Sequence, residues 1–495
     1  MDEKTEKKMD AYREVLRDVY SSIATDRIYV NSRANMDFTY EDHKGEIKTV
    51  TLDPMTSVVI NSAIVPKSTV LIKGGHGGGK TSMIEEVSSR LFDVPKKEIV
   101  AAMIRGNDDQ NVSTLLGTYH MGKLIATGEE EVRWRKFVTC PIKIADEINR
   151  FPPTALNALF EIFNKGRVEF ADQVYEVDDF ELYATENPND AGTYPMSKPF
   201  LDRFGISVPA SQLPAIEDMM ALSARRDDKI YPFKENGYKQ SMKEAKEMEK
   251  IVADNVKMGN EALLYSIYLG QSLSSCIRGD FGDKSHSELS LEERCKGCDF
   301  LTSESLCRRT MDGFSGRAYL DLQRWAKAYS YFLNAFKNPS KPEVQLGIVE
   351  SVAPFVFFHR VTPNEEYSGK DPFFGMKLSY MRDIAKRARE AYVLIKDPLM
   401  EIPRVLSGEI SPDSAKINQV KKDLVVREHF MPIINAARDR DFRTIYDKLE
   451  ETEKVSYSEV IDLDKAMTFT TKISPRGRTF LREKAMTKLD GGASL

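Results

Sequence analysis

The feature that most constrains this chain is a glycine-rich octet that follows a short apolar run. From residue 74 it reads Gly-Gly-His-Gly-Gly-Gly-Lys-Thr, which matches the pattern G-x-x-x-x-G-K-[ST]. In such a loop, backbone N–H groups surround phosphate oxygens, the lysine reaches the β- and γ-phosphates and the hydroxyl binds Mg²⁺. Residues 70–72 read as a strand and residues 82–87 as a helix, whose N-terminal end would also face phosphate. The alternative is a glycine-rich surface turn. The residues expected to bind the nucleotide are Gly74, Gly75, His76, Gly77, Gly78, Gly79, Lys80, Thr81 and Ser82.

Length and composition indicate an ordinary globular chain of several domains. A chain of 495 residues divides into roughly three domains at about 150 residues each. Its net charge of -5 provides no overall attraction to nucleic acid. No apolar run approaches the roughly 20 residues that a membrane helix needs, and the charged N-terminus does not resemble a signal peptide. We therefore expect a cytoplasmic protein.

The order of apolar runs predicts an α/β nucleotide-binding core, with a parallel sheet and helices on both of its faces, followed by an all-α region. Such a sheet binds its ligand at the carboxyl ends of the strands. The expected divisions are a helical and strand-forming N-terminal extension at 1–50, the core at 51–210, a helical lid at 211–362 and a mostly helical C-terminal extension at 363–495.

A second acidic centre is needed if the bound nucleotide is to be hydrolysed. Asp146 and Glu147 follow the apolar-leaning segment 141–145. Asp146 would complete the Mg²⁺ shell together with Thr81, and Glu147 would orient or deprotonate the attacking water. An Asp-Glu pair by itself is weak evidence, but this pair follows a predicted strand downstream of the phosphate loop.

Several ordered motifs resemble those of MoxR-type AAA+ ATPases, in the helix-2-insert clade of that superfamily. They are Asp-Glu-Ile-Asn-Arg-Phe-Pro-Pro at 146–153, Gly-Arg-Val at 166–168, Ala-Thr-Glu-Asn-Pro-Asn at 184–189, Leu-Asp-Arg-Phe at 201–204, Gly-Phe-Ser-Gly-Arg-Ala at 313–318 and Phe-His-Arg at 358–360. The similarity covers residues 58–362. It implies an ATPase that uses ATP and Mg²⁺.

The resemblance also implies roles for three polar residues. Asn187 would be the first sensor, which binds the attacking water or the γ-phosphate; locally it could equally cap a turn before Pro188. Arg203 matches the arginine finger, which acts on the nucleotide of an adjacent subunit and so requires a ring. As an isolated residue, Arg203 would more often be a structural ion-pair partner. Arg317 matches the second sensor, which would contact phosphate within its own subunit.

Two inserted elements and two departures also bear on the resemblance. Residues 112–138 resemble an extra element before the Asp-Glu strand, and residues 166–179 read as a hairpin; each could face a pore, a partner or only solvent. His76 stands where relatives often have Pro, and Gly316 stands where Pro is common.

Four of the five cysteines cluster within the predicted lid. Cys276, Cys295, Cys298 and Cys307 have the spacing C-x18-C-x2-C-x8-C, and a C-x2-C pair can direct two thiolates at one metal ion. Zinc and a 4Fe-4S cluster both accept four cysteines, and the single C-x2-C pair slightly favours iron-sulfur. The alternative is four unrelated free cysteines.

Three functions fit this pattern. The first is a ring-forming ATPase, hexameric by resemblance, that remodels or matures a client protein, with a von Willebrand A domain protein as partner. The second is an ATP-driven nucleic-acid motor or loader with a metal-cluster module, against which the acidic balance argues mildly. The third is a chelatase-like subunit that inserts metal into a cofactor. Stimulation of the ATPase by DNA would favour the second function, and stimulation by a co-encoded protein the first.

Overall fold

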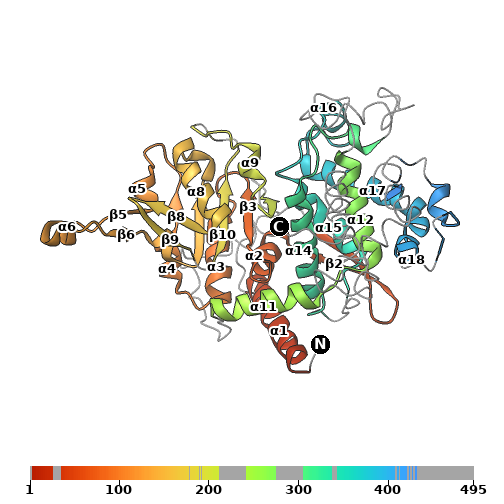
Figure 1. The fold of residues 1–495 in the computed structure, drawn as a ribbon, viewed down its shortest axis with the longest axis horizontal. Coiled ribbons are helices and arrows are strands. Elements are labelled where there is room, and N and C mark those ends of the chain that lie inside the picture. Colours follow the sequence, from red (N-terminus) through yellow and green to blue (C-terminus); the bar gives the residue numbers. More distant parts are fainter. Residues whose placement is uncertain are drawn as a thin grey trace, which may run out of the picture. The chain divides into compact units, whose positions relative to one another are not determined.

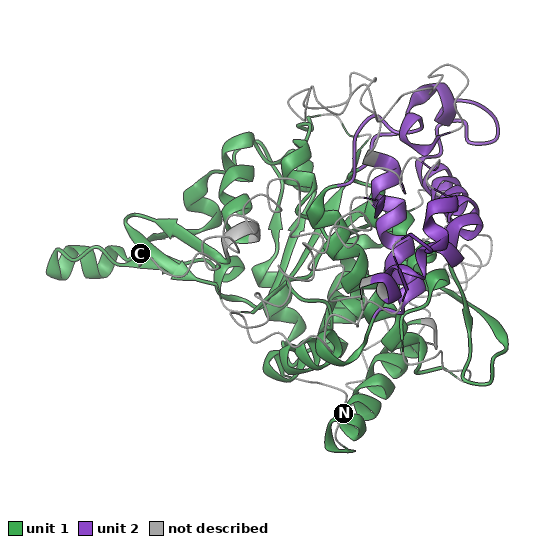
Figure 2. Ribbon diagram, turned by 45° about the vertical axis from the view of Figure 1, so that its right-hand side comes forward, with its two compact units in different colours: residues 1–257, 315–360 green, residues 258–314, 361–495 purple. Residues whose placement is uncertain are grey.

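The computed structural model divides the chain into two compact units. It describes residues 3–25, 35–210 without 178, 189 and 191, 241–274, 305–336, 343–406 and parts of 410–431. Unit 1 comprises Met1–Lys257 and Ser315–Arg360, and unit 2 comprises Met258–Phe314 and Val361–Leu495 (Figure 2).

A five-stranded parallel sheet lies at the centre of unit 1 (Figure 1). Its strands stand in the order β11-β3-β10-β7-β4, and every neighbouring pair is parallel. Strands of a parallel sheet that is covered on both faces are apolar along their length because both of their sides are buried. The apolar residues Val70, Leu71 and Ile72 of β3 are an example. The strands are β3 (Thr69–Lys73), β4 (Ile104–Arg105), β7 (Ile142–Asp146), β10 (Glu181–Glu186) and β11 (Ile206–Pro209).

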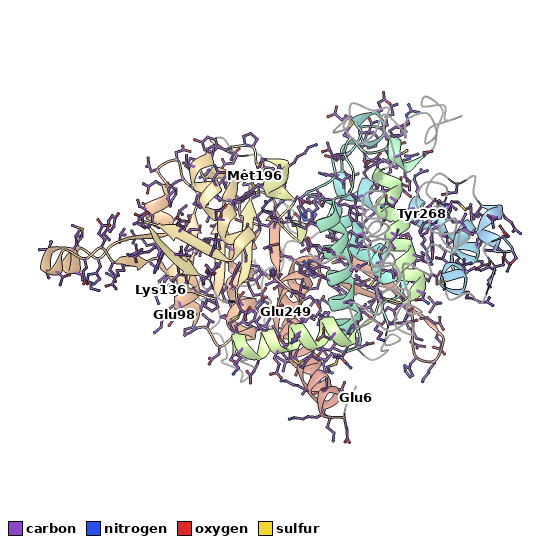
Figure 3. All side chains as sticks on the ribbon, viewed as in Figure 1. Glu6, Glu98, Lys136, Met196, Glu249 and Tyr268 are labelled. Carbon is purple, nitrogen blue, oxygen red and sulfur yellow. The ribbon has the colours of Figure 1, made fainter. Side chains whose placement is uncertain are left out.

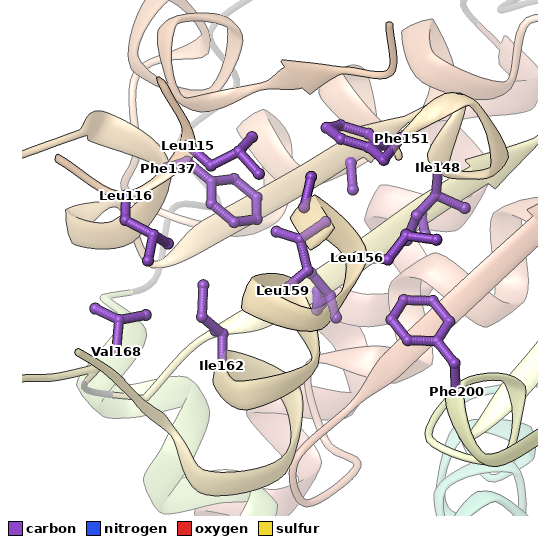
Figure 4. Close-up of a cluster of buried hydrophobic side chains, with 14 of the residues drawn as sticks. Leu115, Leu116, Phe137, Ile148, Phe151, Leu156, Leu159, Ile162, Val168 and Phe200 are labelled. Atoms are coloured by element: carbon purple, nitrogen blue, oxygen red, sulfur yellow. The ribbon is translucent and has the colours of Figure 1, made fainter. Parts of the chain in front are cut away.

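The two faces of the sheet are covered by different helices. Side chains alternate between the faces along a strand, so neighbouring residues of β10 contact different layers. Tyr183 binds Ser62 of α2 at 2.8 Å, and α3 packs on β7 and β10. Leu182 and Ala184 instead join a buried cluster with Leu159 and other side chains of α8 (Figure 4).

The remaining elements of unit 1 surround this sheet or extend from it. They are α1 (Glu3–Thr25), β1 (Met36–Glu41), β2 (Ile47–Leu52), α2 (Pro54–Ser62), α3 (Lys80–Leu91), α4 (Lys96–Ala102), α5 (Val112–Leu115), β5 (Gly117–Tyr119), α6 (Met121–Thr127), β6 (Val132–Trp134), α7 (Lys136–Thr139), η1 (Ile148–Arg150), α8 (Pro153–Lys165), β8 (Arg167–Phe170), β9 (Gln173–Glu176), α9 (Lys198–Leu201), α11 (Met242–Asn255), α14 (Gly316–Leu333) and α15 (Leu346–Phe357). Lys246 of helix α11 pairs with buried Glu181 at the start of β10 at 3.1 Å and with Glu249 of its own helix at 2.7 Å. Figure 3 labels Glu249 on α11.

Two antiparallel ribbons lie beside one another in unit 1. The hairpin predicted at 166–179 is formed by β8 and β9. The insertion at 112–138 contains the ribbon β5–β6, which carries α6 at its tip. Gln173 joins the two ribbons, because its amide donates to Glu130 O at 2.7 Å and accepts from Val132 N at 3.2 Å.

Unit 2 is helical in its described residues. Its elements are α12 (Asn260–Ser274), η2 (Leu306–Arg308), α16 (Glu365–Ser368), α17 (Lys377–Leu399), α18 (Ile402–Leu406) and η3 (Lys416–Gln419). Helices α12 and α17 pack together, and Tyr265 of α12 donates to Ala385 O of α17 at 2.8 Å. Among the described residues, no helix is both long and apolar enough to cross a membrane.

The predicted fold class is confirmed by the parallel sheet with its covering helices and by the helical C-terminal part. Of the four clustered cysteines, Cys276, Cys295 and Cys298 lie outside the described residues. Cys307 is described and is buried in η2.

Candidate nucleotide-binding site

The glycine-rich loop connects the end of β3 to the start of α3, as predicted. Gly77 and Gly79 have φ values of 72° and 69°, in the left-handed region that side chains disfavour. A Cβ on Gly74 would lie 2.4 Å from Ala210 O, so only glycine fits at the point where the loop leaves the sheet. Helix α3 then begins at Lys80 and points its N-terminal end at the loop.

Lys80 is held by the loop itself. Its Nζ donates to Gly74 O at 2.8 Å and to Gly75 O at 2.7 Å. Burial lowers the pKa of the Lys80 ammonium, while the charges of Asp146 and Glu147 act in the opposite direction. The ammonium is therefore partly desolvated beside two carboxylates, which suits a cation that receives a phosphate group.

Asp146 lies at the centre of a hydroxyl network at the end of β7. Its Oδ1 accepts from Thr81 Oγ1 at 2.7 Å and from Thr185 Oγ1 at 2.6 Å. The Thr185 hydroxyl in turn accepts from Glu147 N at 2.9 Å. Thr81 and Asp146 offer the hard oxygen ligands that Mg²⁺ prefers, so the residue types and their closeness fit a magnesium ion.

Glu147 occupies a strained backbone position next to Asp146. Its φ of 50° lies in the left-handed region, where a non-glycine residue is costly and usually held in place by its surroundings. Gly106 N donates to Asp146 O at 2.8 Å, and a Cβ on Gly106 would lie 2.1 Å from Glu147 O. Arg150 holds the Glu147 carboxylate at 3.2 Å and also binds Asp190. These contacts fix the direction of the Glu147 side chain.

Asn187 follows β10 and is fixed by a second asparagine. Asn149 donates through Nδ2 to Asn187 O at 2.9 Å and accepts from Asn187 N at 3.4 Å. The side-chain amide of Asn187 binds His76 of the phosphate loop at 2.6 Å between Nδ2 and Nε2.

These groups line one open cavity of about 240 Å³ at the carboxyl ends of the strands. Of the predicted site residues, the lining includes His76, Gly77, Gly78, Gly79, Lys80, Thr81, Ser82, Asp146, Glu147 and Asn187. Thr185 also lines the cavity. The structure thus brings together the predicted phosphate-binding loop, the two acids and Asn187, the residue expected to be the first sensor.

Arg203 lies at the amino-terminal ends of the strands, opposite the end that carries the phosphate loop. Its carbonyl accepts from Thr69 Oγ1 at 2.7 Å, and Thr69 is the first residue of β3, whereas the phosphate loop follows its last residue. The five residues of β3 extend about 16 Å at ~3.3 Å per residue. The Arg203 guanidinium lies 3.5 Å from the ring centroid of Phe160, and burial, followed by the nearby Arg317 charge, lowers its pKa.

Arg317 lies with Arg203 rather than with the phosphate loop. It is the second residue of α14 and donates to Asp202 Oδ2 at 3.1 Å. Asp202 Oδ1 also accepts from Ser315 Oγ at 2.7 Å and from Arg360 Nε at 3.1 Å. The role that the resemblance implies for Arg317 at the nucleotide stays a prediction; in this structure its guanidinium binds Asp202.

Sequence reasoning missed Thr185, Asn149, Gly106 and Asp202 as site-supporting residues. Thr185 and Asn149 stand inside the motifs 184–189 and 146–153, where a polar side chain after an apolar strand is a usable signal. Gly106 gives no signal in the sequence. Only glycine fits there because the backbone of Glu147, which is distant in sequence, lies against it. Asp202 is marked only by its position before Arg203.

Comparison with known proteins agrees with this site. Residues 69–206 match the model of the ATPase family associated with various cellular activities, AAA. A stretch of 150 residues is 28% identical to the uncharacterized protein YeaC of Bacillus subtilis, covering 29% of this chain and 42% of that protein. The match therefore spans about two fifths of the length of that relative.

A solved structure shares the fold over a larger part of the chain. The crystal structure of a candidate ATPase from Cytophaga hutchinsonii superposes with a TM-score of 0.53 at 20% identity, covering 76% of this chain and 96% of that one. At this identity the likeness concerns the fold. Residues 69–206 are thus similar to the AAA ATPase family, and the chain shares its fold with this solved structure.

Proposed function

We propose that this protein hydrolyses Mg-ATP as a ring-forming ATPase of the MoxR type and uses the turnover to remodel or mature a client protein. The observation that carries the proposal is the network in which Asp146 binds both Thr81 and Thr185 while Glu147 is fixed beside it. This arrangement puts a magnesium-binding pair and a candidate base on the phosphate loop.

Each residue of the site has a chemical task in this proposal. The loop N–H groups and Lys80 hold the phosphate chain, and Thr81 and Asp146 would hold Mg²⁺, which neutralises phosphate charge when bound. Glu147, held by Arg150, orients the attacking water and accepts its proton. Asn187 supplies a neutral hydrogen-bonding group beside the water without adding charge.

The position of Arg203 supports a ring. The backbone carbonyl of Arg203 is bound at the start of β3, and the phosphate loop follows the end of that strand. The strand is about 16 Å long, and this distance is beyond the reach of one arginine side chain. Arg203 would therefore act on the nucleotide of a neighbouring subunit, with Arg317 beside it. In this proposal Arg317 also acts between subunits, because Asp202 holds it at the same edge.

Client remodelling rests on the sequence resemblance and on one surface feature. In α6, Met121 and Ile125 are 59% and 79% exposed, and among its described residues none is buried. Exposed apolar side chains on a projecting element suit contact with a polypeptide. A von Willebrand A domain protein remains the proposed partner, and a cytoplasmic location remains the proposed compartment.

The ATPase is tested by two substitutions that act on different steps. Lys80→Ala should abolish binding of a fluorescent ATP analogue. Glu147→Gln should retain that binding but lower phosphate release by at least about 100-fold, since it removes the base but not the phosphate contacts. Unchanged phosphate release in Glu147→Gln would contradict the proposal.

Capture of bound proteins by Glu147→Gln in ATP, compared with Lys80→Ala, tests for a client. Steeply salt-dependent stimulation by DNA would instead support a nucleic-acid motor.

A metal site at the four cysteines is a separate proposal. Cys307 is buried in η2, and η2 packs against α12, which ends two residues before Cys276. Four thiolates would hold zinc or a 4Fe-4S cluster. Elemental analysis should find zinc or iron in the purified chain and its loss in Cys295→Ser/Cys298→Ser; equal metal content in both would contradict the site.

A further inference from the structure

His76 contacts three parts of the nucleotide site from within the phosphate loop. Its Nε2 lies 2.6 Å from Asn187 Nδ2 and 3.8 Å from Asp190 Oδ2. Its Nδ1 lies 3.7 Å from Glu147 Oε1. Among the described residues that line the cavity, His76 lies against both Asn187 and Glu147.

The chemistry of the short contact defines the state of the imidazole. The amide nitrogen of asparagine only donates hydrogen bonds, so His76 Nε2 must accept from Asn187. A histidine that accepts at Nε2 is neutral and carries its proton on Nδ1. That N–H faces the Glu147 carboxylate, an arrangement that favours this tautomer electrostatically.

We propose that His76 is a positioning residue for ATP hydrolysis, which fixes the amide of Asn187 so that its oxygen is presented to the attacking water. This inference rests on the proposed ATPase function. While His76 holds Nδ2, the atom of the amide left for the cavity is Oδ1. Oδ1 accepts a hydrogen bond from the water, as the Glu147 carboxylate does, and the oxygen lone pair of the water remains directed at phosphorus. An amide presented through Nδ2 would donate to that lone pair and oppose the attack.

Two carboxylates face His76 across the site. Glu147 and Asp190 face the imidazole, and Arg150 binds both carboxylates from η1. Lys80 lines the same cavity from α3.

The test compares His76→Ala and His76→Gln with wild type in the full-length chain, measuring kcat, KM and binding of a fluorescent ATP analogue. His76→Ala should lower kcat by about 3- to 10-fold, the range expected for one neutral hydrogen bond, with analogue binding changed less than about twofold. Glutamine can still accept from Asn187 Nδ2, so His76→Gln should recover most of kcat. His43→Ala, an exposed histidine in the turn between β1 and β2, is the control and should match wild type.

Three results would overturn the inference. The first is a kcat for His76→Ala equal to that of wild type. The second is equal impairment of kcat in the alanine and glutamine variants, as expected for a purely structural role. The third is loss of analogue binding in proportion to kcat/KM. Absence of turnover in wild type itself would instead show that the proposed ATPase function fails, and this inference would fail with it.

Discussion

Thr185 Oγ1 donates a hydrogen bond of 2.6 Å to Asp146 Oδ1, joining the central strand β10 to the acidic end of β7. The same hydroxyl accepts from Glu147 N at 2.9 Å. Thr185 is 1% exposed, so neither bond can be replaced by bulk water. One buried hydroxyl thus positions both the expected magnesium ligand and the expected base.

Thr185→Val should impair turnover more than nucleotide binding. Valine has the shape of threonine but leaves Glu147 N without its acceptor, which costs about 1–3 kcal/mol for a buried group. If that cost falls on the transition state, kcat drops by about 5- to 150-fold. Thr185→Ser keeps the hydroxyl and should retain most of kcat in the same phosphate-release assay. Equal activity of valine and serine variants would contradict the positioning role.

Gly106→Ala should displace Glu147 without any change to a polar group. The added Cβ would meet Glu147 O at 2.1 Å and Arg150 Cβ at 2.9 Å, and a backbone carbonyl cannot move aside cheaply. We expect kcat to fall by at least about 10-fold, while circular dichroism shows a folded protein. In the control Gly122→Ala, the new Cβ meets only His120 ring atoms at 3.6 and 3.8 Å, so kcat should be unchanged. A fully active Gly106→Ala would show that Glu147 tolerates the shift.

Lys143 should make stability depend on pH in the alkaline range. Its buried ammonium in β7 donates to the carbonyls of Phe137, Val138 and Cys140 at 2.6, 2.7 and 2.9 Å, which cap the end of α7. Burial lowers the pKa of Lys143 from 10.5 to about 7. Between these values the unfolded chain binds one proton more than the folded chain, so this group makes the folded state more stable as pH rises from about 7 to 10.5, by at most about 1.36 kcal/mol per pH unit.

Denaturant unfolding at several pH values measures this effect. The stability difference between wild type and Lys143→Met should grow in favour of wild type from pH 7 to pH 10. Lys136→Met removes an exposed lysine of α7, the helix that Lys143 caps. Its free energy of unfolding should change with pH as that of wild type does. A difference that stays constant or shrinks with rising pH would contradict the lowered pKa.

The sequence predicted the strand–loop–helix unit and the Asp-Glu strand because these are local. The octet at 74–81 leaves few conformations other than a phosphate loop, and residues 142–146 are apolar enough to form a buried strand. The hairpin expected at 166–179 is also local, and β8 and β9 form it. Local patterns of this kind depend on neighbouring residues only.

Partners across the sheet could not be predicted in the same way. The contact of Arg317 with Asp202 joins residues 115 positions apart, and the contact of His76 with Asn187 joins residues 111 positions apart. Charge alone does not choose between phosphate and a carboxylate as the partner of an arginine. The choice depends on the edge of the sheet at which α14 begins, which requires the fold.

The most direct test of the account mixes two inactive variants. Arg203→Ala should bind ATP but lack the arginine supplied to a neighbour, and Lys80→Ala should lack ATP binding but keep Arg203. The two variants are dissociated, mixed and reassembled. If Arg203 acts between subunits, phosphate release should return in the mixture. It should return at each interface where Arg203 of a Lys80→Ala subunit meets the ATP of an Arg203→Ala subunit. Mixtures that stay as inactive as the separate variants, or an Arg203→Ala variant as active as wild type, would contradict it.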